Sequence, residues 1–325
     1  MNYDLLYTML NTESVSGGEI PLQKKVAAYM REAGFNVDTD KTGNVIAHIN
    51  EESPVRVLMS GHIDEIGCRV TYISENGMIH VNKAGYIRPE LMQGKRVTVL
   101  GKKRITGVMG ILLKDGNVRT DVALKDMYID CGFTTDKQAA EWIKPGDFVT
   151  YTYAYDMLEN NCIAGRGLDD KLGAFTVMQA LMRAKELNAR AGVYAAATVG
   201  EETGMRGAYF AAARIKPTLA IAVDVIHSSD YPGSDVERFG KIDLGKGPVL
   251  VRSACSNEPT VRRMEDAAKK AGIAVQYEVA GGATGTDSDK MHLSAEGIPM
   301  AVLSIPLRYM HSPSEVGCLT AAEES

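Results

Sequence analysis

Short apolar segments that end in histidine or acidic residues recur along this chain, and they limit the folds open to it. Val55–Met59 is followed by Ser-Gly-His-Ile-Asp-Glu, Val193–Val199 by Gly-Glu-Glu, and Leu219–Val223 by Asp224. Such short runs, rich in β-branched residues or alanine, are typical of buried strands in an α/β sheet. Polar residues at the carboxyl ends of these strands line the crevice where ligands bind. The pattern therefore predicts an α/β fold with a polar site at one edge of its sheet.

Helical patterns alternate with these strands. Residues 21–34 carry apolar side chains at helical spacing and end in glycine, and residues 170–187 and 204–213 separate the later strands. Residues 70–155 differ, because they consist of short alternating segments with frequent glycine. The sequence thus predicts an α/β domain made of residues 1–69 and 156–325, with a small, mainly β domain of residues 70–155 inserted into it.

Charge and cysteine content exclude several classes of protein. The net charge of -5 and the isoelectric point near 5.8 leave no basic surface for nucleic acid. No apolar run reaches the ~18 residues that cross a bilayer, and the N-terminus lacks the basic start of a secretory signal. We therefore expect a cytoplasmic protein that binds neither nucleic acid nor membranes. The five cysteines are scattered and odd in number, which leaves histidine and carboxylate as the metal ligands to consider.

Five motifs carry such ligands. They span residues 60–65, 167–173, 199–204, 219–224 and 308–315. In the first, His62 and Asp64 lie two residues apart on an extended segment and point the same way, so one can bind a metal ion while the other orients the imidazole. Together the motifs supply two histidines, three carboxylates and one further glutamate, which is the set that two divalent ions sharing one carboxylate require.

Each motif also has an ordinary structural explanation. His62 and Asp64 can form a hydrogen-bonded pair, and Asp169 or Asp170 can cap a helix N-terminus. Adjacent glutamates are usually solvated, and Asp224 fits a metal ligand or a loop cap equally well. These explanations must all hold at once, whereas a two-metal site accounts for the five motifs together.

In their order along the chain and in their residues, the motifs resemble those of the glutamyl aminopeptidase and tetrahedral-aminopeptidase family, whose members are sometimes labelled endoglucanases. The matching segments are His-x-Asp-Glu-Ile-Gly, Leu-Asp-Asp-Lys-x-Gly, Gly-Glu-Glu-Thr-Gly, Val-Asp and Tyr-Met-His-Ser-Pro-x-Glu. The resemblance runs from about Ser14 to Val316. It implies an α/β fold in which a mixed sheet is sandwiched by helices and carries a small inserted β-barrel-like domain.

The resemblance also implies a role for each matched residue. The implied metal ligands are His62, Asp169, Glu202, Asp224 and His311. Asp169 would bridge two divalent ions, with His62 and Asp224 completing one site and Glu202 and His311 the other. The implied catalytic residues are Glu201, as general base, and Asp64, behind His62. Zinc is the expected metal, with cobalt and manganese as alternatives.

Four further features follow from the resemblance. The Asp169–Asp170 peptide bond would be cis, and the glycine-rich segment 281–288 would lie near the substrate. The inserted domain would drive dimerisation, and such dimers often build twelve-subunit tetrahedral shells. Relatives continue into a fuller C-terminal helix than the segment after His311 provides.

The expected function is an aminopeptidase that removes N-terminal residues from short peptides by means of a metal-activated water and Glu201. One alternative is a two-metal amidohydrolase or carboxypeptidase that acts on N-acylated amino acids. Another is a catalytically silent assembly protein on the same fold. A glycosidase is disfavoured, because Trp142 is the single tryptophan and aromatic residues make up 6% of the chain. Residues 227–231 and the glycine-rich segment are candidates for the specificity pocket.

Overall fold

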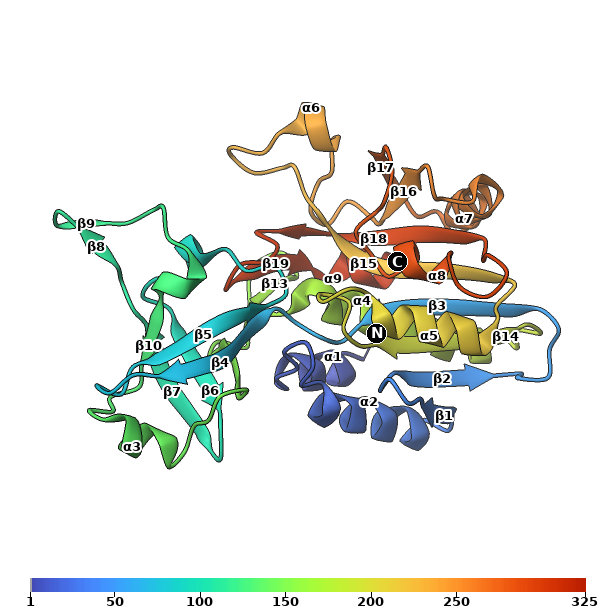
Figure 1. The fold of residues 1–325 in the computed structure, drawn as a ribbon. Coiled ribbons are helices and arrows are strands. Elements are labelled where there is room, and N and C mark those ends of the chain that lie inside the picture. Colours follow the sequence, from blue (N-terminus) through green and yellow to red (C-terminus); the bar gives the residue numbers. More distant parts are fainter. Residues whose placement is uncertain (1) are drawn as a thin grey trace.

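A mixed sheet of eleven strands forms the centre of the larger domain in the computed structural model, which describes residues 2–325 (Figure 1). Its main path runs β1 (Asn36–Thr39), β2 (Val45–Ile49), β14 (Gly192–Thr198), β3 (Arg56–His62), β15 (Leu219–His227), β18 (Met300–Arg308), β19 (Glu315–Cys318), β13 (Cys162–Gly165) and β12 (Tyr155–Met157). A side branch adds β16 (Val249–Ser253) next to β18, and β17 (Gln276–Ala280) next to β16. The expected mixed sheet is confirmed.

Four central strands of this sheet run in the same direction. β14 and β15 both pair in parallel with β3, and β18 pairs in parallel with β15. Their carboxyl ends therefore meet at one edge, as the sequence predicted for the segments that precede the polar motifs. These strands are buried on both faces, which explains their nearly unbroken apolar sequences.

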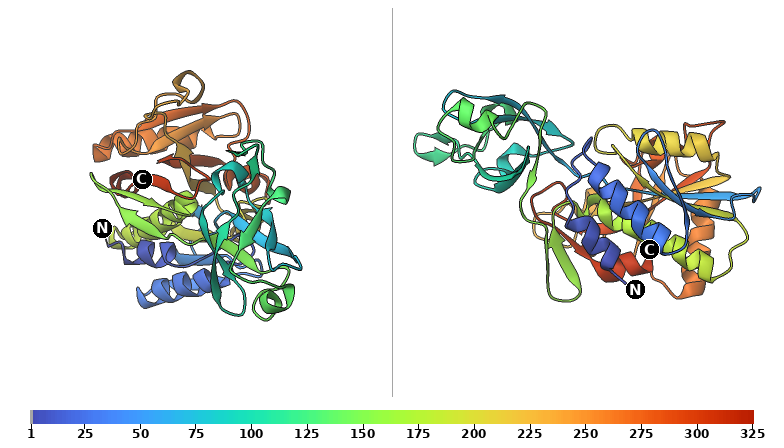
Figure 2. Two further views of the ribbon diagram at one scale, coloured as in Figure 1. Left: turned by 90° about the vertical axis from the view of Figure 1, so that its left-hand side faces the viewer. Right: turned by 90° about the horizontal axis from the view of Figure 1, so that it is seen from below.

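Helices cover both faces of the sheet, as Figure 2 shows. One face packs against α1 (Asp4–Leu10), α2 (Ile20–Glu32), α4 (Leu168–Glu186), α7 (Glu258–Ala271) and α9 (Leu319–Glu324). The other face packs against α5 (Arg206–Ile215) and α8 (Ser288–Met291). A short helix, α6 (Val236–Phe239), lies in the loop that follows β15. Among residues 2–325, no helix combines the length and the apolar character needed to cross a bilayer.

The inserted domain is a closed barrel with its own core. Its strands are β4 (Gly67–Ile73), β5 (Ile79–Ala84), β6 (Arg96–Leu100), β7 (Arg104–Met109), β10 (Tyr128–Asp130) and β11 (Phe148–Tyr151). They alternate buried and exposed residues, as β7 does along its whole length. The hairpin of β8 (Leu113–Lys114) and β9 (Asn117–Val118), the helix α3 (Asp136–Ala140) and 3-10 turns at Pro89–Leu91 and Leu124–Asp126 complete it. The barrel projects from the α/β domain as a separate arm (Figures 1 and 2).

One buried carboxylate joins the two chain segments that enter and leave the barrel. Glu65 precedes β4, and its Oε2 lies 2.5 Å from Arg166 Nη1, which follows β13, and 2.7 Å from Lys171 Nζ on α4. The backbone N–H of Ser14 donates to Oε1 of the same group at 3.2 Å. Burial alone would raise the pKa of Glu65, but the charges of Arg166 and Lys171 lower it to about 2. This carboxylate therefore stays ionised and fixes the base of the barrel.

Candidate metal centre

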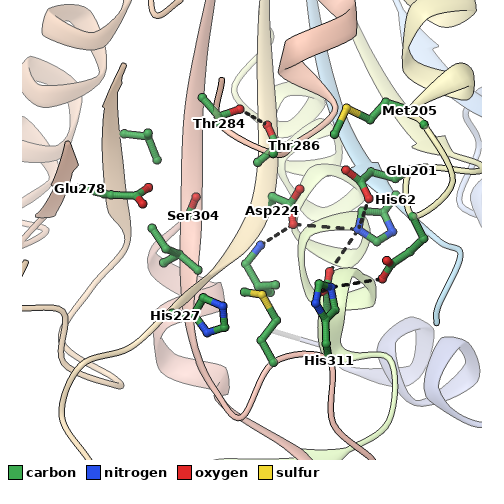
Figure 3. Close-up of a pocket in the computed structure, with 18 residues that line it drawn as sticks. His62, Glu201, Met205, Asp224, His227, Glu278, Thr284, Thr286, Ser304 and His311 are labelled. Carbon is green, nitrogen blue, oxygen red and sulfur yellow. Dashed lines mark hydrogen bonds and ion pairs between the residues drawn. The ribbon is translucent and has the colours of Figure 1, made fainter. Parts of the chain in front are cut away.

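The five predicted ligand side chains lie together in one cavity (Figure 3). One group that could hold a metal ion consists of His62, Asp169 and Asp224, and a second consists of Asp169, Glu202 and His311. Within each group the ligand atoms lie within 4.8 Å of one another. Nε2 of His62 is 3.1 Å from one oxygen of Asp169, and Nε2 of His311 is 3.1 Å from the other. The two groups thus share Asp169, and each uses a different oxygen of its carboxylate.

These side chains come from five different elements of the α/β domain. His62 ends β3, Asp224 lies on β15, and Asp169 opens α4. Glu202 follows β14, and His311 follows β18 with a φ of +59°, in the left-handed region. The peptide bond between Asp169 and Asp170 is cis, as predicted. Long-range strand pairing therefore brings together residues as far apart in the sequence as His62 and His311.

Asp64 lies behind His62 and orients the neighbouring loop. Nδ1 of His62 is 3.0 Å from the carbonyl oxygen of Asp64 and 3.6 Å from its carboxylate. A carbonyl only accepts hydrogen bonds, so Nδ1 carries a proton, and Nε2 is the ring nitrogen that faces the cavity and could bind a metal ion. The Asp64 carboxylate also accepts the backbone N–H groups of Glu201, at 3.0 Å, and Glu202, at 3.3 Å. One side chain thus positions three residues of the site.

Asp170 and Glu315 hold the backbone of the site, and the motif analysis assigned neither of them a role. Asp170 accepts the backbone N–H of His62 at 3.0 Å and that of Gly173 at 2.9 Å. Glu315 accepts the N–H of Asp169 at 3.2 Å and that of His311 at 2.9 Å. Both carboxylates lie within the matched motifs, close in sequence to the predicted metal ligands. This closeness is the sequence signal that could have pointed to them. Their partners are defined by the fold alone.

The cavity concentrates acidic groups with little positive charge to balance them. Burial, reinforced by neighbouring carboxylates, raises the pKa of Glu201 to about 9 and that of Asp224 to about 8. Burial and the adjacent Asp169 raise the pKa of Glu202 as well. Within the described residues, Oε1 of Glu201 and Oε1 of Glu202 are buried without a hydrogen-bond partner. Buried oxygens of this kind are costly unless a cation approaches them, so the residues fit divalent ions.

The cavity has a volume of about 440 Å³ and extends well beyond the ligands. Thr284, Gly285 and Thr286 of the glycine-rich segment line it, in agreement with the place expected for that segment. His227, the first residue of the 227–231 segment that the sequence offered as a candidate for the specificity pocket, lines it too. Burial, together with the charges of His311 and Arg88, lowers the pKa of His227, so its imidazole is neutral at pH 7.

The barrel domain reaches the rim of this cavity. The Tyr86 ring lies 5.6 Å from the His311 ring, measured between centroids. A Cβ atom at Gly85 would lie 3.0 Å from Oε2 of Glu202 and 2.8 Å from Ile66. The close approach of Gly85 to a predicted metal ligand therefore requires glycine there, and its φ of +88° requires it as well.

Comparison with known proteins agrees with this arrangement. The sequence profile of a family described as M42 glutamyl aminopeptidase matches residues 43–325. The chain belongs to this family. Lysyl aminopeptidase of Pyrococcus furiosus is a relative that is 31% identical, with 97% of this chain and 92% of the relative covered. The predicted family membership is confirmed, and this M42 chain is a hydrolase of the aminopeptidase type.

Solved M42 structures show the same fold. A TET aminopeptidase from a marine sediment archaeon, Thaumarchaeota archaeon SCGC AB-539-E09, superposes with a TM-score of 0.92 at 30% identity, covering 99% of this chain and 92% of the other. The TET1 peptidase of Pyrococcus horikoshii, which can assemble into a tetrahedron or a large octahedral shell, gives a TM-score of 0.85 at 28% identity and covers 98% and 95% of the two chains.

Proposed function

We propose that this chain is a two-metal aminopeptidase that hydrolyses the N-terminal residue from short peptides, with Glu201 as general base. The observation that carries the proposal is the pair of ligand groups that share Asp169, with Glu201 in the same cavity. His62 and Asp224 would hold one divalent ion, Glu202 and His311 the other, and Asp169 both. Histidine and carboxylate ligands favour zinc and also accept cobalt or manganese.

The ions would supply a Lewis acid for the scissile carbonyl and a lowered pKa for a water molecule. The remaining chemistry belongs to side chains. Glu201 is almost fully buried, its Oε2 lies 3.9 Å from Nε2 of His62, and its Oε1 faces no partner among the described residues. With two cations bound beside it this carboxyl would be ionised, although its pKa is raised to about 9 without them. It would take a proton as the water oxygen bonds to the carbonyl carbon, and would return it to the leaving amine as the C–N bond breaks.

Substrates with free and blocked N-termini separate this function from its nearest rival. The rival is a two-metal amidohydrolase or carboxypeptidase that acts on N-acylated amino acids with the same ligands. The protein is stripped with a chelator, reloaded with zinc, cobalt or manganese, and assayed on aminoacyl anilides and on N-acetyl amino acids. Turnover of the free amines alone supports the aminopeptidase. Turnover of the acetylated forms alone would overturn it, and no turnover of either would favour a silent assembly protein.

We further propose that the barrel domain mediates self-association into dimers, and that dimers assemble further as in the TET proteins. Large apolar side chains are exposed on the barrel, where Ile111, Leu113 and Val118 are each at least half exposed. Exposed apolar groups that lie close together mark association surfaces. The net charge of -5 and the absence of a membrane-crossing helix in residues 2–325 are compatible with the proposed cytoplasmic location.

A further inference from the structure

Glu278 on β17 is a cavity residue that the proposed chemistry does not use. It lines the same cavity as the metal ligands, and Figure 3 shows it on the far side of Asp224 and Ser304 from His62 and His311. Its side chain is half-buried, and among the described residues it has no hydrogen bond or ion pair. Burial raises the pKa of this carboxyl, which means that its charged form lacks a compensating partner.

Strand register places Glu278 on the same sheet face as Asp224. Asp224 pairs with Ser304, Ser304 pairs with Val249, and Val251, two residues further along, pairs with Glu278. Directly paired residues and residues two apart in a strand project to the same face. Three strand spacings of ~4.8 Å lie between β15 and β17, so the two strands are about 14 Å apart. This leaves room for the backbone of a substrate residue at the metal centre and for an extended side chain reaching towards Glu278.

The cavity wall between the metal ligands and Glu278 suits a long side chain with a positively charged end. Ile226 and Val251 supply apolar wall, and Ser304 and Thr284 add hydroxyl groups. No lysine or arginine of residues 2–325 lines the cavity, so nothing in its wall neutralises Glu278. An alkyl stem would pack along the apolar wall, and its cationic end would pair with the half-buried carboxylate.

We propose that Glu278 is a specificity-determining residue that makes lysine and arginine the preferred N-terminal residues of the substrate. The inference rests on the proposed aminopeptidase function and adds the class of side chain that the cavity selects. An acidic side chain would be repelled by Glu278, and a leucine side chain would leave its charge unpaired.

Lysyl, arginyl, leucyl and glutamyl anilides test the proposal on the metal-loaded protein. We expect kcat/KM for the lysyl anilide to exceed that for the leucyl anilide at least tenfold, and glutamyl anilide to be the poorest substrate. Glu278→Gln should lower kcat/KM for the lysyl and arginyl anilides 10- to 100-fold and change the leucyl value less than threefold. Glu278→Lys should raise the glutamyl value above that of the unmodified protein. Glu52→Gln, an exposed site before β3, is the matched control and should change none of these values.

The outcomes separate the two proposals. Efficient leucyl turnover without a lysyl preference, or an equal loss for all substrates in Glu278→Gln, would overturn the role of Glu278 and leave the aminopeptidase standing. If no free-amine anilide is turned over after metal loading, the proposed function fails and the specificity inference fails with it. Melting temperatures of the variants within a few degrees of the parent show that the substitutions do not unfold the protein.

Discussion

Glu201 and Glu202 are adjacent in sequence, yet the fold gives them different surroundings. Oε1 of Glu202 lies 3.7 Å from Nε2 of His311, within the second ligand group. Glu201 belongs to neither ligand group, and its backbone N–H is held by Asp64. The proposed division of labour between a ligand and a base therefore rests on one shared loop, in which each carboxylate has different neighbours.

Glu201→Gln should retain both metal ions and lose most of the turnover. The amide keeps the size of the side chain but cannot take a proton, so kcat should fall roughly 10²- to 10⁴-fold. Elemental analysis of the purified variant and an anilide assay measure the two properties separately. Asp169→Asn is the contrasting variant and should lose metal from both groups. Wild-type turnover by Glu201→Gln would refute the assignment of the base.

The stability of the metal-free protein should decrease as the pH rises from about 6 to about 8. Burial raises the pKa of Glu201 from 4.5 to about 9 and that of Asp224 from 3.8 to about 8, so both acids bind protons in the folded state that the unfolded chain has already released. The unfolding free energy therefore falls with pH in this window. Above it, burial lowers the pKa of Lys171 to about 8, which acts in the opposite direction.

Thermal unfolding in a chelator, followed across this pH range, measures the effect. The melting temperature of the parent should fall, and that of Glu201→Gln should fall less because one of the two acids is gone. Adding divalent ions should raise the melting temperature most at the upper end of the range. A melting temperature of the chelated parent that rises with pH would contradict the charge arrangement described for the cavity.

Sequence motifs predicted the ligands because each sits in a short segment with its own pattern. His62 with Asp64, and Glu201 with Glu202, could be read from spacing alone. Glu278 could not, because nothing local distinguishes it from a solvated glutamate on an edge strand. Its place in the cavity depends on the pairing of β16 with β17 and of β16 with β18, which are contacts between distant parts of the chain.

At the level of elements, the contact between β3 and α4 determines where Asp169 lies. Gly61, next to His62, faces the backbone of Gly173 and Ala174, and a Cβ atom at this position would collide with both. α4 can therefore lie close enough for Asp170 to accept the N–H of His62. Glycine at this position is a packing requirement between a strand and a helix, not a turn preference.

Gly61→Ala should destabilise the protein by roughly 1–3 kcal/mol, the usual cost of overpacking a core, and should weaken metal binding. Chemical denaturation and metal titration measure the two effects. Gly281→Ala is the matched control, since a Cβ atom there meets nothing within 4 Å. Equal stability of the two variants would show that the helix accommodates the methyl group.

Element prediction succeeded where the hydrophobic period was clear. The expected helix at 170–187 corresponds to α4, and the expected strand at 193–199 to β14. The sequence reading placed no element at α7, although Asn257 caps its start and Gly272 ends it. That helix is mostly polar and exposed, and its few apolar side chains form only a narrow stripe along one face.

For the whole molecule, assembly through the barrel is the property most open to a direct test. Leu113→Glu places a charge on the β8–β9 hairpin, at a side chain that is 63% exposed. We expect this variant to shift towards smaller species in light scattering coupled to size exclusion. Leu187→Glu, at a site 64% exposed on the α/β domain, is the control and should leave the mass unchanged. A smaller mass for Leu187→Glu and an unchanged mass for Leu113→Glu would instead place the association surface on the α/β domain.

The shared carboxylate of Glu65 limits how the arm can move. Tilting the barrel away from the α/β domain would pull Thr150 of β11 off this buried carboxylate, and losing a hydrogen bond to a charged group costs about 1.5–3 kcal/mol. Tyr86 of the barrel is therefore expected to keep its place beside the His311 ring. A barrel held at its base keeps Tyr86 at this edge of the cavity, so we expect the entrance beside His311 to admit an extended chain end more readily than a folded one.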